Sequence, residues 1–441
     1  MTNLDAALHA QQETMAASPN FNFGFTITDL YRRDGLVRLD QIFVDFLRTG
    51  DETLYKRLEH ARAHPDELPP KDDSALLIEI APWVEDFIAR LFNIENEVQQ
   101  LAAKHHELAP LYFCKRQFVQ RKAKGKVSDT ELMGIDGLAL EKELAAEFGE
   151  AFSELVFATK VTQWMESEAE NETRLNKALH YAAWALRTPA GQRHTQQGIL
   201  FKSPAKLDFQ HLLSLNTDDS AGYPVHRLDH LRERNGFALT DGGTDLMGAL
   251  DEANYCIWCH EQGKDSCSKG MIQKPKAPDE VPTFKKSELG ALLAGCPLEE
   301  RISEFHKLKT QGVAVGSLAM IALDNPMCAG TGHRICNDCM KSCIYQKQEP
   351  VDIPQAETRT LKDVLALPWG FEIYSLLTRW NPLNLRRPVP KPASGRKVLV
   401  VGMGPAGYTL AHHLMNEGHT VVGIDGLKIE PLPEEISGVN Q

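Results

Sequence analysis

The sequence predicts a mainly α-helical protein whose C-terminal part changes into one β-strand, α-helix, β-strand unit. Three observations support this fold class. Apolar residues recur at helical spacing along residues 39–47, and they do so again along residues 80–101. Near the C-terminus, β-branched runs at 396–401 and 420–424 flank a glycine-rich turn and a helical pattern.

Length and charge favour a soluble enzyme. The chain has 441 residues and a net charge of -12, which suits two or three globular units with a sizeable core. No apolar run approaches the roughly 20 residues of a membrane helix, and the acidic balance disfavours a nucleic-acid partner. Residues 1–25 contain no basic and then apolar signal segment. We therefore expect a cytoplasmic protein that binds neither membrane nor nucleic acid.

Residues 1–250 are predicted to form a helical domain that carries no catalytic motif, so its role stays open. Residues 64–71 should form a loop, because Pro65, Pro69 and Pro70 lack the amide hydrogen that a helix interior uses. The basic stretch at 115–126 is expected to be a solvated helix face rather than a docking patch.

Eight of the nine cysteines lie between positions 256 and 343, which is the most informative feature of the central region. In chain order these are Cys256, Cys259, Cys267, Cys296, Cys328, Cys336, Cys339 and Cys343. A short loop between two cysteines lets both sulfurs reach one ion or cluster, and a distant cysteine can then complete the ligand set. The ninth, Cys114, is expected to be an ordinary core residue.

Iron–sulfur clusters explain the spacing of these cysteines better than the alternatives do. Disulfides are disfavoured because the chain should stay where thiols are kept reduced. Zinc uses similar pairs but usually recruits histidine or a second pair of the same spacing. Clusters of the four-iron type need four ligands each and tolerate a proline directly after a cysteine, as in Cys296-Pro297. Zinc remains the alternative at this point.

The glycine-rich turn predicts a dinucleotide-binding loop. Gly402 permits the tight turn, Gly404 lets the backbone approach a pyrophosphate, and Gly407 lets the helix pack on the strand. Pro405 and Ala406 lie in this turn, and the helical pattern follows at 408–417. Asp425 ends the second strand, where a carboxylate can accept a hydrogen bond from a ribose hydroxyl. The motif does not distinguish FAD from NAD(P).

The two features in this order resemble a known family. Residues from about 251 to 426 are similar to the small subunit of glutamate synthase and to the N-terminal part of dihydropyrimidine dehydrogenase. The matching segments are 295–298, 302–305, 325–326, the cysteine triplet at 336–343 and 349–353. The resemblance implies an α-helical ferredoxin-like domain with two 4Fe-4S clusters at 251–381, a linker at 382–395, and the start of a Rossmann-like FAD-binding domain at 396–441.

The resemblance also implies a crossed set of ligands. Cys256, Cys259 and Cys267 would hold one cluster with the remote Cys343 as fourth ligand. Cys296, Cys336 and Cys339 would hold the other cluster with Glu357, and Cys328 is the alternative to Glu357. The sequence departs from the family in the insertion at 269–294 and in Cys328 itself.

In such a family, electrons pass between NAD(P)H, FAD and the two clusters to an acceptor or catalytic subunit, which the sequence leaves unknown. Only the first strand, helix and second strand of a dinucleotide fold precede Gln441. We therefore expect the chain to be part of a longer flavoprotein oxidoreductase, or a subunit whose flavin domain is completed elsewhere. The alternative function is a non-catalytic, zinc-stabilised helical interaction module.

Overall fold

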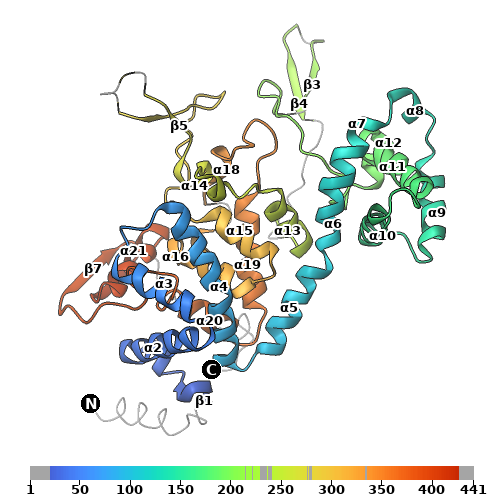
Figure 1. The fold of residues 1–441 in the computed structure, drawn as a ribbon. Coiled ribbons are helices and arrows are strands. Elements are labelled where there is room, and N and C mark those ends of the chain that lie inside the picture. The colour runs from blue at the N-terminus through green and yellow to red at the C-terminus, as the bar shows by residue number, and fades with distance from the viewer. Residues whose placement is uncertain are drawn as a thin grey trace.

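The computed structural model describes residues 20–426 except 214, 221, 229–235, 237–240, 276, 278–280, 333 and 334. In this part of the chain the protein is mainly helical, as predicted, and its strands form two-stranded sheets (Figure 1).

The N-terminal part consists of a short hairpin and three long helices. The elements are β1 (Asn20–Phe21), η1 (Asn22–Gly24), β2 (Phe25–Thr26), η2 (Asp29–Tyr31), α2 (Arg33–Gly50), α3 (Glu52–Ala63) and α4 (Pro70–Phe92). The expected proline-rich loop ends at Pro69, because Pro70 occupies the first turn of α4, where no amide hydrogen is needed. The helical repeat along 80–101 is divided in the structure. α4 ends at Phe92, its C-cap Asn93 has a left-handed φ of 55°, and α5 (Glu95–Glu107) follows.

A second group of helices follows α5, which leads from one side of the molecule to the other in Figure 1. Its elements are α6 (Ala109–Cys114), the π-helix η3 (Lys115–Ala123), α7 (Lys124–Lys126), α8 (Asp129–Met133), α9 (Gly137–Phe148), α10 (Glu154–Glu166), α11 (Glu172–Arg187) and α12 (Pro189–His194). An antiparallel hairpin of β3 (Leu215–Asp218) and β4 (Val225–Leu228) comes next.

The cysteine-rich region consists of short helices and four longer ones. Its elements are α13 (Leu246–Tyr255), η4 (Cys259–Gln262), α14 (Ser266–Lys269), β5 (Ile272–Gln273), β6 (Thr283–Phe284), α15 (Ile302–Thr310), α16 (Ala314–Asp324), α17 (Cys328–Thr331), α18 (Asp338–Lys341), α19 (Ile353–Leu365) and α20 (Gly370–Leu377). The antiparallel pair β5 and β6 lies inside the insertion expected at 269–294 and projects from the helices in Figure 1.

The chain then forms the predicted strand, helix, strand unit from β7 (Lys397–Val401), α21 (Pro405–Asn416) and β8 (Thr420–Ile424). β7 and β8 pair in parallel, with Lys397 opposite Thr420 and Val401 opposite Ile424. Parallel pairing requires a crossover connection, and α21 provides it.

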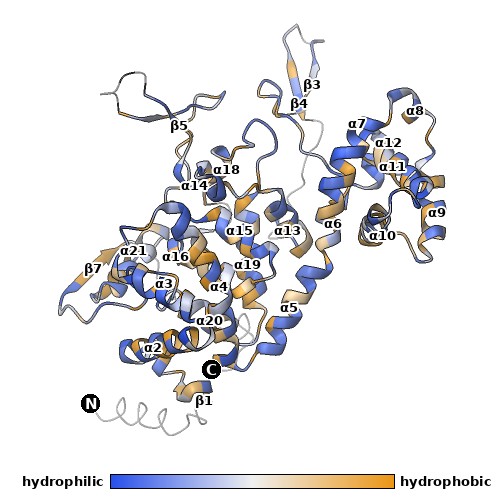
Figure 2. Cartoon of the chain, in the orientation of Figure 1, coloured by the Kyte–Doolittle hydropathy of each residue, from blue (hydrophilic) through white to orange (hydrophobic). Residues whose placement is uncertain are grey.

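Two hydrophobic cores organise the described helices. The first combines α2, α3 and α4 with α15, α16, α19 and α20, and the strongly hydrophobic α16 runs through its centre (Figure 2). The second is built from α6, η3, α9, α10 and α11. The segment expected as one unit at 1–250 is therefore divided between both cores. Its first helices belong with the cysteine-rich region, because α4 packs against α15 and α16 and α2 and α3 pack on α4.

The proline-rich segment at 382–395 packs on the N-terminal helices. Leu383 and Leu385 are buried in the first core, and Arg62 donates a hydrogen bond to the carbonyl of Pro382 at 3.3 Å. Arg33 also donates to the carbonyl of Pro390 at 2.9 Å. This segment is therefore attached along its length, which fixes where β7 begins relative to the first core.

Candidate metal centres

Four cysteines from three separate segments line one cavity, which we call the first centre: Cys256, Cys259, Cys267 and Cys343. Cys256 follows the last residue of α13, and Cys259 begins η4. Between them Trp258 has a left-handed φ of 50°, which turns the chain back so that both sulfurs face the same space. Cys267 comes from α14 and Cys343 from the loop after α18.

The wall of the first centre is mostly apolar. The side chains that complete it are Ile257, Ser266, Ile302, Ser303, His306, Ile344, Tyr345, Val351 and Ile353. Burial raises the pKa of Cys256 to about 12 and that of Cys259 to about 11, and it raises the pKa of Cys267 well above its usual value. Burial therefore favours the thiol form of these cysteines, and a cation that binds them has to replace their protons.

A second group, the second centre, contains Cys296, Cys336 and Cys339. Burial raises the pKa of Cys339, and the charges of Glu300, Cys296 and Cys336 raise it further. The two centres are directly linked, because the backbone N–H of Cys296 donates to the carbonyl of Cys267 at 2.8 Å. The N–H of Gly295 also donates to the Ser342 hydroxyl at 2.9 Å, which ties this segment to the cysteine triplet.

Both candidates for the eighth ligand are buried near the second centre. On α19, the Glu357 carboxylate accepts a hydrogen bond from the Asn325 amide at 2.9 Å, and burial raises the pKa of Glu357 to about 7. Cys328 begins α17, and its sulfur lies 3.8 Å from the Tyr374 hydroxyl. Burial raises the pKa of Cys328, and the charge of Glu357 raises it further.

Sequence reasoning missed Glu300, which lies four residues after Cys296. Glu300 is 4% exposed, and within the described residues its Oε1 atom has no hydrogen-bond partner. Burial raises the pKa of Glu300 well above its usual value, and Glu357, Asp324 and Cys336 raise it further. The available signal was a pair of acids, Glu299 and Glu300, directly after a Cys-Pro-Leu segment. It carried no weight without knowledge that residue 300 is buried.

No group of three or more His, Cys, Asp or Glu side chains among the described residues is arranged to hold one metal ion. A four-iron cluster makes a different demand, because each of its four ligands binds a different iron atom.

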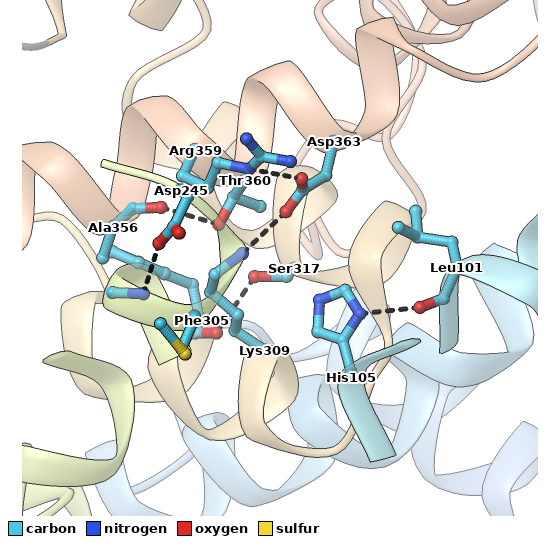
Figure 3. A network of polar contacts seen from close by, with 12 residues as sticks. Leu101, His105, Asp245, Phe305, Lys309, Ser317, Ala356, Arg359, Thr360 and Asp363 are labelled. Atoms are coloured by element: carbon cyan, nitrogen blue, oxygen red, sulfur yellow. Dashed lines mark hydrogen bonds and ion pairs between the residues drawn. The ribbon is translucent and has the colours of Figure 1, made fainter. Parts of the chain in front are cut away.

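The helices behind the first centre are held by buried polar contacts (Figure 3). The Lys309 ammonium on α15 reaches the Asp363 carboxylate on α19 at 3.0 Å, and Arg359 donates to the other oxygen of Asp363 at 2.6 Å. On α5, the His105 Nδ1–H donates to the carbonyl of Leu101 at 2.8 Å, since a carbonyl can only accept. These contacts fix α15 and α19 relative to each other.

The basic stretch at 115–126 keeps Arg116, Arg121, Lys124 and Lys126 exposed, as expected of a solvated face, but its first two residues also contact α13. Lys115 is only 12% exposed and pairs with Asp251 on α13 at 2.6 Å, and Arg116 donates to the carbonyl of Asn254 at 2.8 Å. The start of the stretch therefore packs against the helix that leads to Cys256. A cavity of about 430 Å³ lies beside this contact, and Tyr345 lines both this cavity and the first centre.

The glycine loop between β7 and α21 is tightly packed at Gly402 and Gly407 and has free space beside Gly404. Gly402 has a φ of 92°, which an L side chain rarely adopts, and its N–H donates to the carbonyl of Ile424 at 2.7 Å. A Cβ atom on Gly407 would lie 1.8 Å from the Gly402 oxygen, whereas a Cβ on Gly404 would meet nothing within 4 Å. Gly404 is the N-cap of α21, so the open side coincides with a helix N-terminus.

Pro405 and Ala406 form the first turn of α21, which begins three residues before the helical pattern expected at 408–417. The Asp425 carboxylate accepts a hydrogen bond from the Met403 N–H at 2.5 Å, so this acid joins the end of β8 to the glycine loop. The donor set fits a pyrophosphate, because backbone N–H groups and the positive end of a helix dipole both favour an anion there.

Similarity to known proteins identifies the family of the chain. The uncharacterized protein RP005 of Rickettsia prowazekii is 34% identical to it over 299 residues, which are 66% of this chain and 98% of RP005. The chain belongs to the RP005 family. The family described as the RP005 N-terminal alpha-helical domain matches residues 21–93, which span β1 to α4. These RP005-type helices are the ones that share the first core with the cysteine-rich region.

Two further relatives match shorter parts of this RP005-family chain. The uncharacterized protein RP006 of Rickettsia prowazekii is 59% identical over 106 residues, 24% of this chain and 15% of RP006. The NADPH glutamate synthase small chain of Bacillus subtilis is 31% identical over 137 residues, 31% of this chain and 24% of that protein. The chain is thus a distant relative of an oxidoreductase subunit and spans under a quarter of its length. No solved structure matches the chain. None of the described helices has the length and apolarity to cross a membrane.

Proposed function

We propose that this chain is the iron–sulfur component of an NAD(P)H-dependent flavoprotein oxidoreductase, with two 4Fe-4S clusters and a loop for the dinucleotide part of FAD. The observation that carries the proposal is the first centre, where Cys256, Cys259, Cys267 and Cys343 line one cavity. Cys343 lies 76 positions or more from the other three, and a fold without a shared ligand has no reason to bring it to them.

The chemistry of the first centre supports a cluster. Four cysteine thiolates are the usual ligands of a four-iron cluster, and an apolar wall limits the access of water to it. The backbone N–H of Trp258 donates to the Cys256 sulfur at 3.4 Å, and a donor of this kind stabilises a thiolate ligand.

The second centre supports a cluster with three cysteines and one further ligand. We assign Cys296, Cys336 and Cys339, with Glu357 as the fourth ligand and Cys328 as the alternative. Glu357 is supported by its buried carboxylate, which among the described residues accepts from the Asn325 amide. Cys328 instead faces the Tyr374 hydroxyl, which itself donates to the carbonyl of Pro326 at 2.7 Å.

The glycine loop supports FAD as the third cofactor. Gly402 and Gly407 shape the turn, Gly404 leaves space for the pyrophosphate, and Asp425 stands where a ribose hydroxyl would be bound. The solvent-facing side of the parallel pair is apolar, with Leu399, Val401, Val422 and Ile424 exposed. An apolar sheet face of this kind is typical of a doubly wound fold in which further elements cover the sheet.

Bound FAD would take a hydride from NAD(P)H and exchange single electrons with the clusters. This chain's own part is to hold the cofactors, to exclude water from the first centre and to set the potentials through ligands and hydrogen bonds. The electron acceptor is proposed to be a partner or a catalytic subunit, which the glutamate synthase small chain suggests by analogy.

Anaerobic purification followed by iron and acid-labile sulfide assays tests the proposal. We expect about eight iron and about eight sulfide per chain, with the broad visible absorbance of sulfur-to-iron charge transfer. Cys259→Ser should lower both values to about four, whereas the matched control Cys114→Ala should leave them unchanged, since Cys114 lies in the second core. Stoichiometric zinc without sulfide would reject the clusters and favour a structural zinc module.

A further inference from the structure

His306 has an unusual environment for a histidine. It lies on α15 with no exposed surface, and neither of its ring nitrogens has a hydrogen-bond partner in the described part of the chain. Its ring packs edge-on against Phe305, with centroids 4.4 Å apart at 66°. A buried polar atom without a partner loses its hydrogen bonds to water and gains none in the protein, so two such atoms in one ring call for a ligand.

The position of His306 indicates which ligand that is. His306 lines the first centre together with the four cysteines. A neutral imidazole offers one N–H donor, and the sulfur atoms of a cluster or of its thiolates are acceptors. The sulfur is the only atom of a cysteine side chain that can accept this hydrogen bond.

The other buried histidines near the centre each have at least one ring nitrogen in a hydrogen bond. His260 shares a 2.6 Å hydrogen bond with the Ser303 hydroxyl. His105 donates through Nδ1 to the Leu101 carbonyl, and it is absent from the wall of the first centre. Among the described side chains on that wall, His306 is thus the histidine whose hydrogen-bonding capacity is unused.

We infer that His306 donates an N–H hydrogen bond to a sulfur atom of the first cluster and thereby raises the reduction potential of that cluster. The inference rests on the proposed function of the first centre. A donor to sulfur stabilises the reduced, more negative cluster, so the potential rises. His306 is therefore a positioning and tuning residue rather than an iron ligand.

The test compares His306→Phe, His306→Asn and His306→Gln with the wild-type holoprotein. An electron paramagnetic resonance redox titration gives the midpoint potential of each cluster, and Cys259→Ser identifies the signal of the first. We expect His306→Phe to lower the potential of the first cluster and to leave the second unchanged. Either His306→Asn or His306→Gln should restore it, because their amide N–H groups stand in for Nδ1 and Nε2 respectively.

A second readout detects the hydrogen bond itself. After exchange into D₂O, pulsed electron paramagnetic resonance of the reduced first cluster should detect an exchangeable deuterium. This signal should disappear in His306→Phe and persist in the amide variant that restores the potential. His105→Phe is the matched control, because it removes a buried histidine that lies outside the first centre.

The iron assay separates failure of this inference from failure of the proposed function. A wild-type protein without iron and sulfide rejects the clusters, and the inference with them. A fully loaded His306→Phe variant with the wild-type potential and deuterium signal overturns only the role of His306. If His306→Phe does not assemble iron, the Asn and Gln variants decide: loss of the deuterium signal in both, at wild-type potential, overturns the inference.

Discussion

Lys309 and Asp363 form an ion pair in which each side chain is only 1% exposed, with Nζ and Oδ2 3.0 Å apart. The pair joins α15, which carries His306, to α19, which carries Glu357. The relative position of the two proposed centres therefore depends in part on one buried charge pair.

Removing Lys309 or Asp363 should destabilise the fold to different extents, because only Asp363 has a second charged partner. Asp363 also accepts from Arg359 at 2.6 Å. Asp363→Asn removes the carboxylate that balances Lys309, and leaving a buried charge unpaired costs about 3–5 kcal/mol. Lys309→Met leaves Asp363 with Arg359, so we expect a smaller loss. Melting temperatures measured at one scan rate test this order of stability. A larger fall in melting temperature for Lys309→Met than for Asp363→Asn would contradict it.

Glu85 predicts a specific pH dependence of stability. Its carboxylate accepts from the Val315 N–H at 2.7 Å and from the Gly316 N–H at 3.3 Å, which attaches α4 to the start of α16. Burial raises the pKa of Glu85 from 4.5 to about 7. As the pH rises from about 4.5 to 7, the unfolded chain loses this proton first, so the free energy of unfolding falls by about 3 kcal/mol.

Glu85→Gln keeps an acceptor for both N–H groups and removes the titration. We expect its melting temperature to exceed that of the wild type increasingly between pH 5 and pH 8, and to match it more closely below. Other carboxylates titrate equally in both proteins and cancel in the difference. If the melting temperatures of the two proteins changed in parallel with pH, Glu85 would not be protonated in the folded state.

Much of the fold and of the candidate site could be read from local sequence. The strand, helix, strand unit was predictable because the roles of Gly402 and Gly407 are set by neighbouring backbone, and the structure shows a positive φ at the first and close packing at the second. The proposed first ligand set was accessible only through the resemblance, since the spacing alone does not say that Cys343 joins Cys256.

The missed features depend on distant contacts. Glu300 and His306 become notable only when they are buried without a partner, and sequence shows neither burial nor pairing. The division of residues 1–250 between two cores follows from α4 packing on α16, which no helical period reveals. The break at Asn93 was missed because apolar residues keep their spacing through Ile94 and Val98, although the backbone turns there.

The crossed ligand scheme makes a prediction that sequence proximity would not. Cys343 lies four residues after Cys339, yet it lines the cavity of Cys256, Cys259 and Cys267. Cys343→Ser should therefore remove the first cluster, lower iron to about four per chain, and leave the resonance signal of the Cys296 cluster. Cys339→Ser should have the complementary effect. Loss of the same signal in both variants would reject the crossed scheme.

The glycine loop allows folding and cofactor binding to be tested separately. Gly407→Ala places a Cβ atom against the backbone oxygen of Gly402, so it should destabilise the βαβ unit by about 1–3 kcal/mol, as overpacking does. Gly404→Ser has open space for its side chain and keeps a favourable N-cap residue, so its melting temperature should stay close to that of the wild type.

The same Gly404→Ser side chain would occupy the space that a pyrophosphate needs. Because β7 and β8 leave much of an FAD molecule in water, binding to this chain should be weak, and saturation-transfer magnetic resonance with FAD is the suitable measurement. We expect a transfer signal for the wild type that Gly404→Ser abolishes without loss of iron. An equal saturation-transfer signal with both proteins would mean that FAD binds at another site, because binding would then not need the free space beside Gly404.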